Sequence, residues 1–302
     1  MTTRLERTTS GRFPSTGTAA VGGFPDAGAL DLPKISIRNV SHSYAVRGRR
    51  GAAPTTLLAV DDFSLDIRRG EFVVIVGPSG CGKSTLLDFL SGLVQPTAGT
   101  ILDDGEPVVR PGLGRAIVFQ QYALFPWRTA EANIEFGLEA KGIKRRERKA
   151  LVQKYLSLVG LEGFGQRYPH ELSGGMKQRV AIARSLAYEP DVILMDEPFA
   201  ALDAQTREQL QDELLRIWRE TGKTIVFITH SIDEAVYLGQ RVAVMTSRPG
   251  RLKEIVTIDH VESEDDGDVR SNPDFARQRH TIWNLLRDEV IDAARTESGS
   301  RD

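Results

Sequence analysis

The sequence predicts an α/β fold built on a mostly parallel sheet. From Phe63 onward, short apolar runs alternate with helix-length segments, which is the order expected when helices cross over between parallel strands. The run from Phe72 to Val76 is apolar at every position, as is typical of a strand buried on both faces. The runs Val192 to Met195 and Ile225 to Ile228 have the same character. These three runs are therefore expected to lie in the centre of the sheet.

Length and composition limit the classes of protein that this chain can be. Its 302 residues, 40% of them hydrophobic, suffice for one large or two modest domains and exclude a disordered chain. Its 39 Lys and Arg residues are balanced by 41 Asp and Glu residues, which argues against a protein that coats nucleic acid. The single cysteine allows no intrachain disulfide, and no apolar run approaches the roughly 18 residues that cross a bilayer. We therefore expect a cytosolic chain.

The patterning divides the chain into three parts. Residues 1–33 are rich in Thr, Ser, Gly, Ala and Pro without periodicity, so we expect a disordered tail. Order is expected from Lys34, where alternating isoleucines predict a strand. The charged residues 139–160 and the amphipathic residues 206–220 each predict a helix. Residues 259–302 predict an acidic linker and then a helical extension.

A glycine-rich loop follows the first buried strand and leads into an apolar helical start. We call it the P-loop; it reads Gly77, Pro78, Ser79, Gly80, Cys81, Gly82, Lys83, Ser84, Thr85. In such a loop, glycines let backbone N–H groups turn inward around an anion at a helix N-terminus. The pattern assigns Lys83 to the β- and γ-phosphates of a nucleotide, Ser84 to Mg²⁺, and Cys81 to a small spacer. The alternative is a glycine turn without a ligand, which the strand-loop-helix context disfavours.

Two adjacent carboxylates end the second buried strand. Asp196 is expected near the metal, through water, and Glu197 is expected to polarise an attacking water. The alternative is that the pair caps the next helix. Together with the P-loop, this motif predicts a nucleoside triphosphatase without saying which one.

A third motif lies between these two and is more specific. Residues 172–176 read Leu-Ser-Gly-Gly-Met and are followed by Lys177, Gln178 and Arg179. This segment resembles the signature of ATP-binding cassette (ABC) proteins. In that family the signature caps the γ-phosphate of ATP held by the partner subunit, through serine and glycine amides at a helix start. Met176 departs from the glutamine of many ABC proteins, but it does not touch the catalytic carboxylate.

Further positions match the motifs of the family in order. Tyr44 matches the aromatic residue that stacks on adenine, Gln120 the glutamine that senses the γ-phosphate and metal, and His230 the histidine that contacts the γ-phosphate. Residues 201–203, Ala-Leu-Asp, match the segment that crosses the dimer. A core or surface tyrosine remains the alternative for Tyr44, and a strand-terminal histidine remains the alternative for His230.

The resemblance therefore implies a full set of site residues, with ATP and Mg²⁺ as ligands. Those implied for catalysis are Glu197, His230 and Gln120, and those implied for the metal are Ser84, Gln120 and Asp196. Those implied for nucleotide binding are Tyr44, Gly77, Pro78, Ser79, Gly80, Cys81, Gly82, Lys83, Ser84, Thr85, Asp196, Ser173, Gly174, Gly175, Met176 and Asp203.

The same resemblance covers about residues 34–256 and sharpens the predicted fold. It implies a P-loop NTPase of the ABC type, with a mostly parallel core sheet, an antiparallel β subdomain and an inserted α-helical subdomain. The ATPase domain is expected at 34–258, with its helical subdomain at about 121–185.

Three phrases resemble one subgroup, the nitrate, sulfonate and taurine importer ATPases; they are residues 118–128, 218–223 and 247–251. The resemblance implies an ATP-hydrolysing, energy-coupling subunit of an ABC importer for nitrate, taurine or aliphatic sulfonates. The implied partners are a second copy of the chain, two transmembrane permease subunits and a periplasmic or extracellular substrate-binding protein, with no nucleic acid. The implied location is the cytoplasmic face of the cell membrane, as a peripheral protein.

Two rival functions and one local ambiguity stay open. A soluble ABC ATPase acting on nucleic acid or ribosomes usually carries two cassettes or a long coiled-coil insertion, and this chain has neither. A small-molecule phosphotransferase should lack the signature. In the family, the segment after Gln120 lies near the groove that receives a short coupling helix of the permease. Here Phe125, Trp127 and Arg128 fit either that interface or the packing of the helical subdomain.

Overall fold

The computed structural model describes residues 32–46, 55–259 and 269–299, with side chains described up to Glu289 in the last range. The strands are β1 Ile35–Val46, β2 Thr55–Ile67, β3 Phe72–Val76, β4 Ala98–Asp103, β5 Glu106–Pro107, β6 Arg115–Val118, β7 Val192–Asp196, β8 Thr224–Thr229, β9 Arg241–Met245 and β10 Leu252–Thr257. The α-helices are α1 Lys83–Ser91, α2 Ala130–Ala140, α3 Arg145–Leu158, α4 Gly174–Ala187, α5 Ala204–Thr221, α6 Ile232–Leu238 and α7 Pro273–Gly299. Two short 3₁₀ helices are η1 Pro169–Glu171 and η2 Val269–Ser271. The expected disordered tail, up to residue 31, and most of the acidic linker lie outside the described residues.

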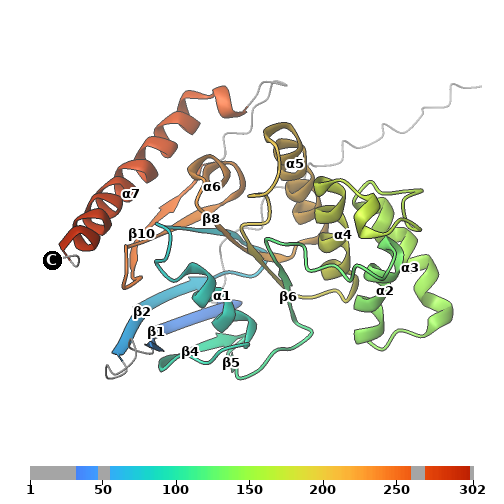
Figure 1. The fold of residues 1–302 in the computed structure, drawn as a ribbon, viewed down its shortest axis with the longest axis horizontal. Helices are drawn as coiled ribbons and strands as arrows, with labels where there is room; N and C mark the ends of the chain where they lie inside the picture. Colours follow the sequence, from blue (N-terminus) through green and yellow to red (C-terminus); the bar gives the residue numbers. More distant parts are fainter. Residues whose placement is uncertain (1–31, 47–54, 260–268, 300–302) are drawn as a thin grey trace, which may run out of the picture. The chain divides into compact units, whose positions relative to one another are not determined.

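The strands form two sheets (Figure 1). A six-stranded sheet has the order β10-β9-β3-β8-β7-β6, in which every pair is parallel except β10 with β9. A four-stranded antiparallel sheet has the order β2-β1-β4-β5. This is the α/β architecture with a mostly parallel sheet and an antiparallel sheet that the sequence predicted. The carboxyl ends of β3, β7 and β8 meet at one edge, where ligands bind in open parallel sheets.

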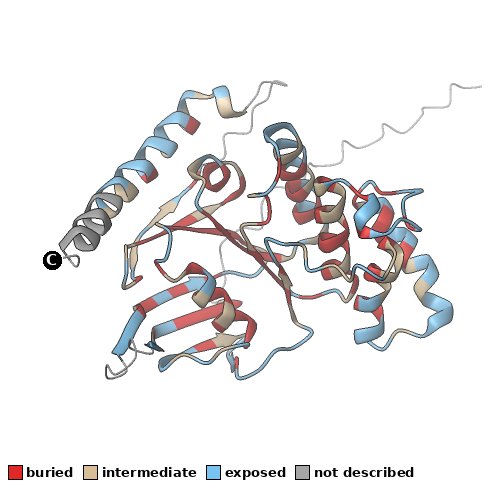
Figure 2. Cartoon of the chain, viewed as in Figure 1, coloured by how far each residue is buried: buried red, intermediate tan, exposed pale blue. Residues whose placement is uncertain are grey.

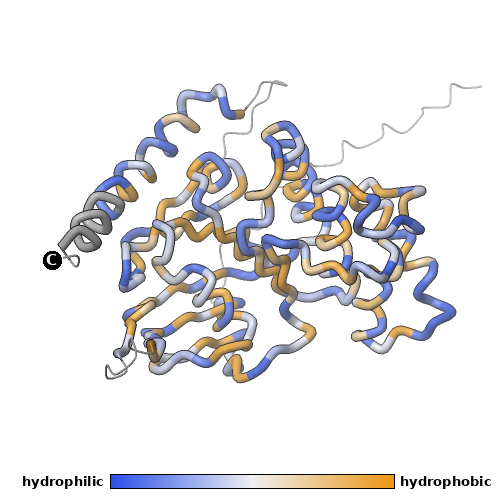
Figure 3. The backbone as a smooth tube through the Cα atoms, in the orientation of Figure 1, coloured by the Kyte–Doolittle hydropathy of each residue, from blue (hydrophilic) through white to orange (hydrophobic). Residues whose placement is uncertain are grey.

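The core follows from the alternation of side chains along the central strands. In β3, Phe72, Val74 and Val76 pack on one face with the helices α2 to α7, while Val73 and Ile75 pack on the other. That second face holds α1, which lies between the two sheets. Figure 2 shows the central strands buried along their length, and Figure 3 shows them mainly apolar. The three fully apolar runs of the sequence are therefore buried on both faces, as predicted.

The helices confirm two predictions from periodicity and correct a third. Helix α5 contains the predicted residues 206–220, and α7 contains the predicted C-terminal helix. The expectation that residues 139–160 are helical is confirmed for 139–140 and 145–158 but not for the turn between them, because α2 ends at Ala140 and α3 begins at Arg145. Gly142 between them has a φ of 80°, a left-handed conformation that stops a helix and that glycine adopts without strain.

Candidate functional site

The P-loop joins β3 to α1 and folds around its own lysine. Gly82, the N-cap of α1, has a φ of 102°, so a side chain at this position would be strained. The ammonium of Lys83 donates to the carbonyl oxygens of Gly77 at 2.8 Å and Pro78 at 3.0 Å, and its side chain is buried. A phosphate in this loop would offer the same ammonium a charged partner, and charge-assisted hydrogen bonds are the stronger kind. Lys83 is therefore placed where it could pair with an anion bound in the loop.

The β9–β10 turn and Tyr44 pack against the P-loop. Cys81 is fully buried, which raises the pKa of its thiol, and its backbone carbonyl lies against the β9–β10 turn. A Cβ added at Gly250 in that turn would lie 1.9 Å from the Cys81 carbonyl oxygen, so only glycine fits there. On the other side, the hydroxyl of Tyr44 lies 3.1 Å from Thr85 Oγ1, which brings this tyrosine beside the first turn of α1.

Asp196, at the end of β7, lies next to the P-loop serine. Its Oδ1 accepts a hydrogen bond from Ser84 Oγ at 3.4 Å. Burial raises the pKa of Asp196, and the carboxylates of Glu197 and Asp88 raise it further, while the bond from Ser84 lowers it. A cation placed here would offset the cost of the buried charge. The pair of oxygens is therefore the sort of partial shell that Mg²⁺ completes with water and phosphate oxygens.

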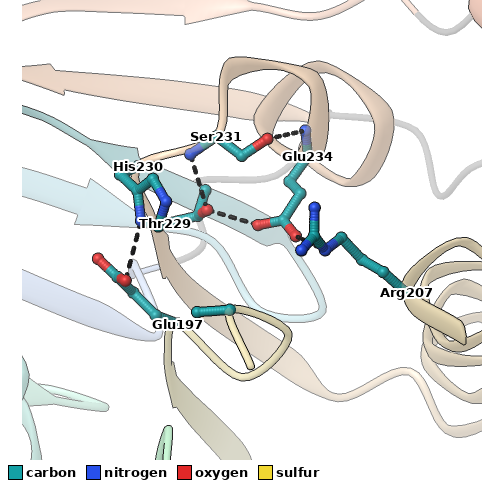
Figure 4. A pocket seen from close by; sticks show the side chains of 7 residues that line it. Glu197, Arg207, Thr229, His230, Ser231 and Glu234 are labelled. Carbon is teal, nitrogen blue, oxygen red and sulfur yellow. Dashed lines mark hydrogen bonds and ion pairs between the residues drawn. The ribbon is translucent and has the colours of Figure 1, made fainter. Parts of the chain in front are cut away.

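Glu197 and His230 form a pair where β7 and β8 end. Glu197 has a φ of 43°, held by the hydrogen bond from its backbone N–H to the Ile228 carbonyl at 2.9 Å. Its Oε2 lies 2.9 Å from Nδ1 of His230, which follows β8. Figure 4 shows this contact between the two side chains, which together line one side of a small pocket. A carboxylate beside an imidazole can accept a proton from a bound water, and left-handed backbone at a carboxylate is a strained position often found at functional sites.

The signature segment stands apart from these groups. Ser173 is the N-cap of α4, and its Oγ accepts from the Met176 backbone N–H at 3.3 Å. Gly175 is packed so closely that a Cβ there would lie 2.6 Å from Thr206 Cγ2. Ser173 itself is exposed. Among the described residues, no hydrogen bond or ion pair joins residues 173–176 to the P-loop, so the fold does not bring the two motifs together within one chain.

The last two predicted residues lie on exposed segments. Gln120 follows β6 and is exposed; the turn after it is fixed by Arg184 of α4, whose guanidinium donates to the Ala123 and Tyr122 carbonyls at 2.6 Å and 3.1 Å. Asp203 is the N-cap of α5, and the hydrogen bond from the Thr206 backbone N–H at 3.0 Å lowers the pKa of its carboxyl. Within this chain Asp203 therefore caps a helix.

Two residues near the site and one in α2 were missed by sequence reasoning. The guanidinium of Arg248 donates to the P-loop carbonyl of Gly80 from Nε at 3.2 Å and Nη2 at 3.1 Å. Glu234 is buried in the pocket behind His230, where its carboxylate accepts from Thr229 Oγ1. Asn133 is fully buried in α2 and bonds the backbone of Phe125 and Arg128. Arg248 lies in one of the three subgroup phrases; for the other two the sequence offered no signal.

In the part of the chain that the structure describes, no group of three or more His, Cys, Asp or Glu residues lies together in a way that could hold a metal ion. Nor does any helix of that part have the length and apolar character required to cross a membrane.

Comparison with known proteins decides the family. The ABC transporter family model matches residues 60–200. An uncharacterized ABC transporter ATP-binding protein of Methanocaldococcus jannaschii is 51% identical over 258 residues, which are 85% of this chain and 93% of the relative. This chain belongs to the ABC transporter ATP-binding family. The ABC cassette is an ATPase, and the resemblance stated from its motifs is confirmed.

Named relatives and solved structures add detail to the family. The nitrate import ATP-binding protein of Synechocystis is 47% identical over 80% of this chain and 91% of the relative. The taurine import ATP-binding protein of Jannaschia is 44% identical over 88% of this chain and 99% of the relative. A dimeric ATP-binding cassette in a post-hydrolysis state with ADP and Pi matches with a TM-score of 0.64 at 33% identity, over 75% of this chain and 100% of the matched chain. These matches give the nucleic-acid alternative no support.

Proposed function

We propose that this cassette hydrolyses ATP at the edge formed by β3, β7 and β8, with Glu197 as general base. The observation that carries this proposal is the 2.9 Å contact between Glu197 Oε2 and His230 Nδ1, at the strand ends beside the P-loop. Lys83 and the backbone amides of the P-loop would bind the phosphates, and Tyr44 would stack on adenine. Glu197 would take a proton from the attacking water while His230 contacts the γ-phosphate. The ATPase domain is proposed to span residues 34–258, with the helical subdomain at about 121–185.

The metal in this proposal is Mg²⁺, held by Ser84, Asp196 and Gln120 together with the ATP phosphates. Ser84 Oγ and Asp196 Oδ1 already adjoin one another, and both are hard oxygen ligands of the kind that Mg²⁺ prefers. When bound, Mg²⁺ would neutralise phosphate charge during hydrolysis. The raised pKa of Asp196 supports this assignment, because a nearby cation would relieve the buried charge.

Two copies of the chain are proposed to complete each site. The exposed Ser173 at the N-terminus of α4 makes no hydrogen bond to its own P-loop. A helix N-terminus with free backbone N–H groups attracts anions, so residues 173–176 of one copy would cap the γ-phosphate bound by the other. Asp203 would lie at the junction. The match to a dimeric cassette bound to ADP and Pi supports a head-to-tail homodimer with two sites.

The permease is proposed to dock on an aromatic cluster of the helical subdomain. Trp127 is 72% exposed, and its ring lies 5.7 Å from that of Phe125. The Arg128 guanidinium lies 5.5 Å from the Phe125 ring and 5.4 Å from the Phe136 ring. Exposed tryptophan beside arginine is the composition of interface hot spots. A short helix of the permease would cover this cluster, two permease subunits serving one ATPase dimer.

The transported cargo is proposed to be nitrate, taurine or an aliphatic sulfonate. The support is the similarity to the nitrate and taurine import ATP-binding proteins. The cargo would be captured by a periplasmic or extracellular substrate-binding protein, and the cassette would sit peripherally on the cytoplasmic face of the cell membrane.

Co-purification and uptake test this function together. The cassette expressed with its own permease and binding protein should co-purify with them, hydrolyse Mg-ATP, and drive uptake of at least one of the three anions into vesicles. Omission of Mg²⁺ should stop hydrolysis. A cassette that hydrolyses ATP but drives uptake of none of these anions would refute the cargo assignment, and a cassette without ATPase activity would refute the whole proposal.

A further inference from the structure

The segment after the ATPase domain is docked along the six-stranded sheet and α6. We call residues 269–289 the C-terminal strap; it comprises η2 and the first part of α7. Phe275 and Ile282 of the strap are buried in the same core cluster as Val236 and Leu238 of α6. This apolar anchor positions two polar ends of the strap, and each of them is linked through intervening residues to a different part of the proposed nucleotide site.

The first polar end runs from Arg270 to the loop that carries His230. Arg270 Nη2 donates to Gln211 Oε1 at 2.7 Å, and its guanidinium lies 4.1 Å from the ring of Tyr237. Gln211 Nε2 donates to Glu234 Oε1 at 3.3 Å. Both Gln211 and Glu234 are buried, so this chain of contacts is shielded from water.

The chain continues from Glu234 to His230 through one residue. Thr229 Oγ1 donates to the Glu234 carboxylate and accepts from the Ser231 backbone N–H at 3.0 Å. The residues on both sides of His230 are thereby held (Figure 4). Glu234 lies 3.9 Å from Arg207 Nε, which supplies the opposite charge on the other wall of the pocket. Arg270 is thus the outer member of the network that orients the histidine loop.

The second polar end is Glu289 on α7. Its carboxylate accepts from the Ser247 backbone N–H at 2.8 Å and pairs with Lys253 Nζ at 2.7 Å. Burial raises the pKa of Glu289, but the bonds from Lys253 and Ser247 outweigh it and lower the pKa below its ordinary value. Ser247 precedes Arg248, whose guanidinium donates to the Gly80 carbonyl in the P-loop. Glu289 therefore holds the β9–β10 turn, and Arg248 of that turn holds the P-loop.

We propose that the C-terminal strap positions both catalytic segments of this cassette: Arg270 orients the His230 loop, and Glu289, through Ser247 and Arg248, orients the P-loop. The inference rests on the proposed function, because it takes the P-loop and His230 as parts of the ATPase site. Neither residue reaches the reacting atoms, so both are positioning residues. Since the two ends act on different segments, their effects on the kinetic constants differ.

The test is a comparison of kcat and KM for ATP in single variants of the full chain. Arg270→Ala should lower kcat about tenfold with KM within about twofold, because it loosens a group used in the transition state. Arg270→Lys, which keeps a charged donor for Gln211, should recover most of that loss. Glu289→Ala should instead raise KM for ATP about tenfold with little change in kcat, because the P-loop binds the phosphates in the ground state. Glu289→Gln should fall between Glu289→Ala and the unmodified chain.

Arg279→Ala is the matched control. Arg279 also lies on α7 and faces α6, where it is exposed and pairs with Asp233 at 3.5 Å outside both polar chains. Its removal should leave both constants within about twofold. Arg270 and Glu289 variants with constants equal to those of the control would overturn the proposal, even if their melting temperatures fall. A parallel loss of kcat in both variants, without the split in KM, would also overturn it. An unmodified chain without ATPase activity would instead refute the proposed function.

Discussion

Replacement of Glu197 by glutamine separates the chemical step from nucleotide binding. The side chain is partly buried, and its Oε2 lies 2.9 Å from His230 Nδ1. Glutamine has nearly the same shape and keeps an oxygen that can accept from this histidine, so the local fold should survive. It cannot take a proton from water. Loss of a general base costs about 10² to 10⁴ in rate, which is about 3 to 5 kcal/mol of barrier.

The assay is steady-state phosphate release beside equilibrium binding of ATP. Glu197→Gln should retain ATP affinity within a few-fold, lose hydrolysis by the stated factor and accumulate as an ATP-bound dimer in size-exclusion chromatography. Glu208→Gln, a substitution at an exposed position on α5, is the matched control and should behave as the unmodified chain. Turnover of Glu197→Gln within threefold of the unmodified chain would refute the assignment of the base.

Three further predictions concern stability and coupling. Burial raises the pKa of Asp196 above its ordinary value, so the charged carboxylate destabilises the nucleotide-free fold at pH values above that pKa, and this destabilisation disappears as the pH falls through the pKa. Asp196→Asn should therefore raise Tm at neutral pH yet abolish the extra rise in Tm produced by Mg-ATP. A lowered Tm for Asp196→Asn would contradict this prediction. Asn133→Ala removes a buried side chain that bonds the backbone of residues 125–129, and denaturant titration should show a loss of about 1 to 3 kcal/mol, whereas a loss under 0.5 kcal/mol would contradict its role. Trp127→Ala should leave Tm and the ATPase of the isolated cassette unchanged while uncoupling hydrolysis from the permease, and a collapse of Tm would show that Trp127 packs the fold.

The central strands could be predicted from the sequence because a strand buried on both faces is apolar at nearly every position. Phe72 to Val76 is apolar at every position, rich in β-branched residues and followed by a glycine, which together favour a strand buried on both faces. The nucleotide motifs were equally accessible, because glycine spacing and strand-end carboxylates are local requirements of the chemistry. The division of residues 139–160 into two helices was missed, although Gly142 marks the break, because the charged pattern continues across it.

Positioning residues could not be predicted in the same way. Glu234 and Gln211 are polar residues at buried positions, and their value depends on which partners the tertiary fold supplies. Asn133 reads in sequence as an unremarkable polar residue of a helix, yet its side chain meets the backbone of a segment that precedes the helix. Such contacts produce no periodic pattern in the sequence. The same holds for Arg270, whose partner Gln211 lies far away in the sequence.

Mixed dimers test the central claim, that each ATP site is shared by two copies of the chain, most directly. Lys83→Ala disables the P-loop, and Ser173→Arg places a long cation where the signature of one copy would meet the ATP of the other. Each variant alone should be inactive, since both of its sites carry one damaged half.

In a mixture of equal amounts, half of the dimers formed at random contain both variants, and each of these has one intact site. The mixture should therefore recover about a quarter of the unmodified ATPase activity if the two sites act independently. Lys223→Ala replaces a partly exposed lysine after α5 and, mixed in the same way with Ser173→Arg, controls for dilution. Activity that stays at the sum of the two inactive variants would contradict the shared site, whereas recovery to about a quarter is the result that this account predicts.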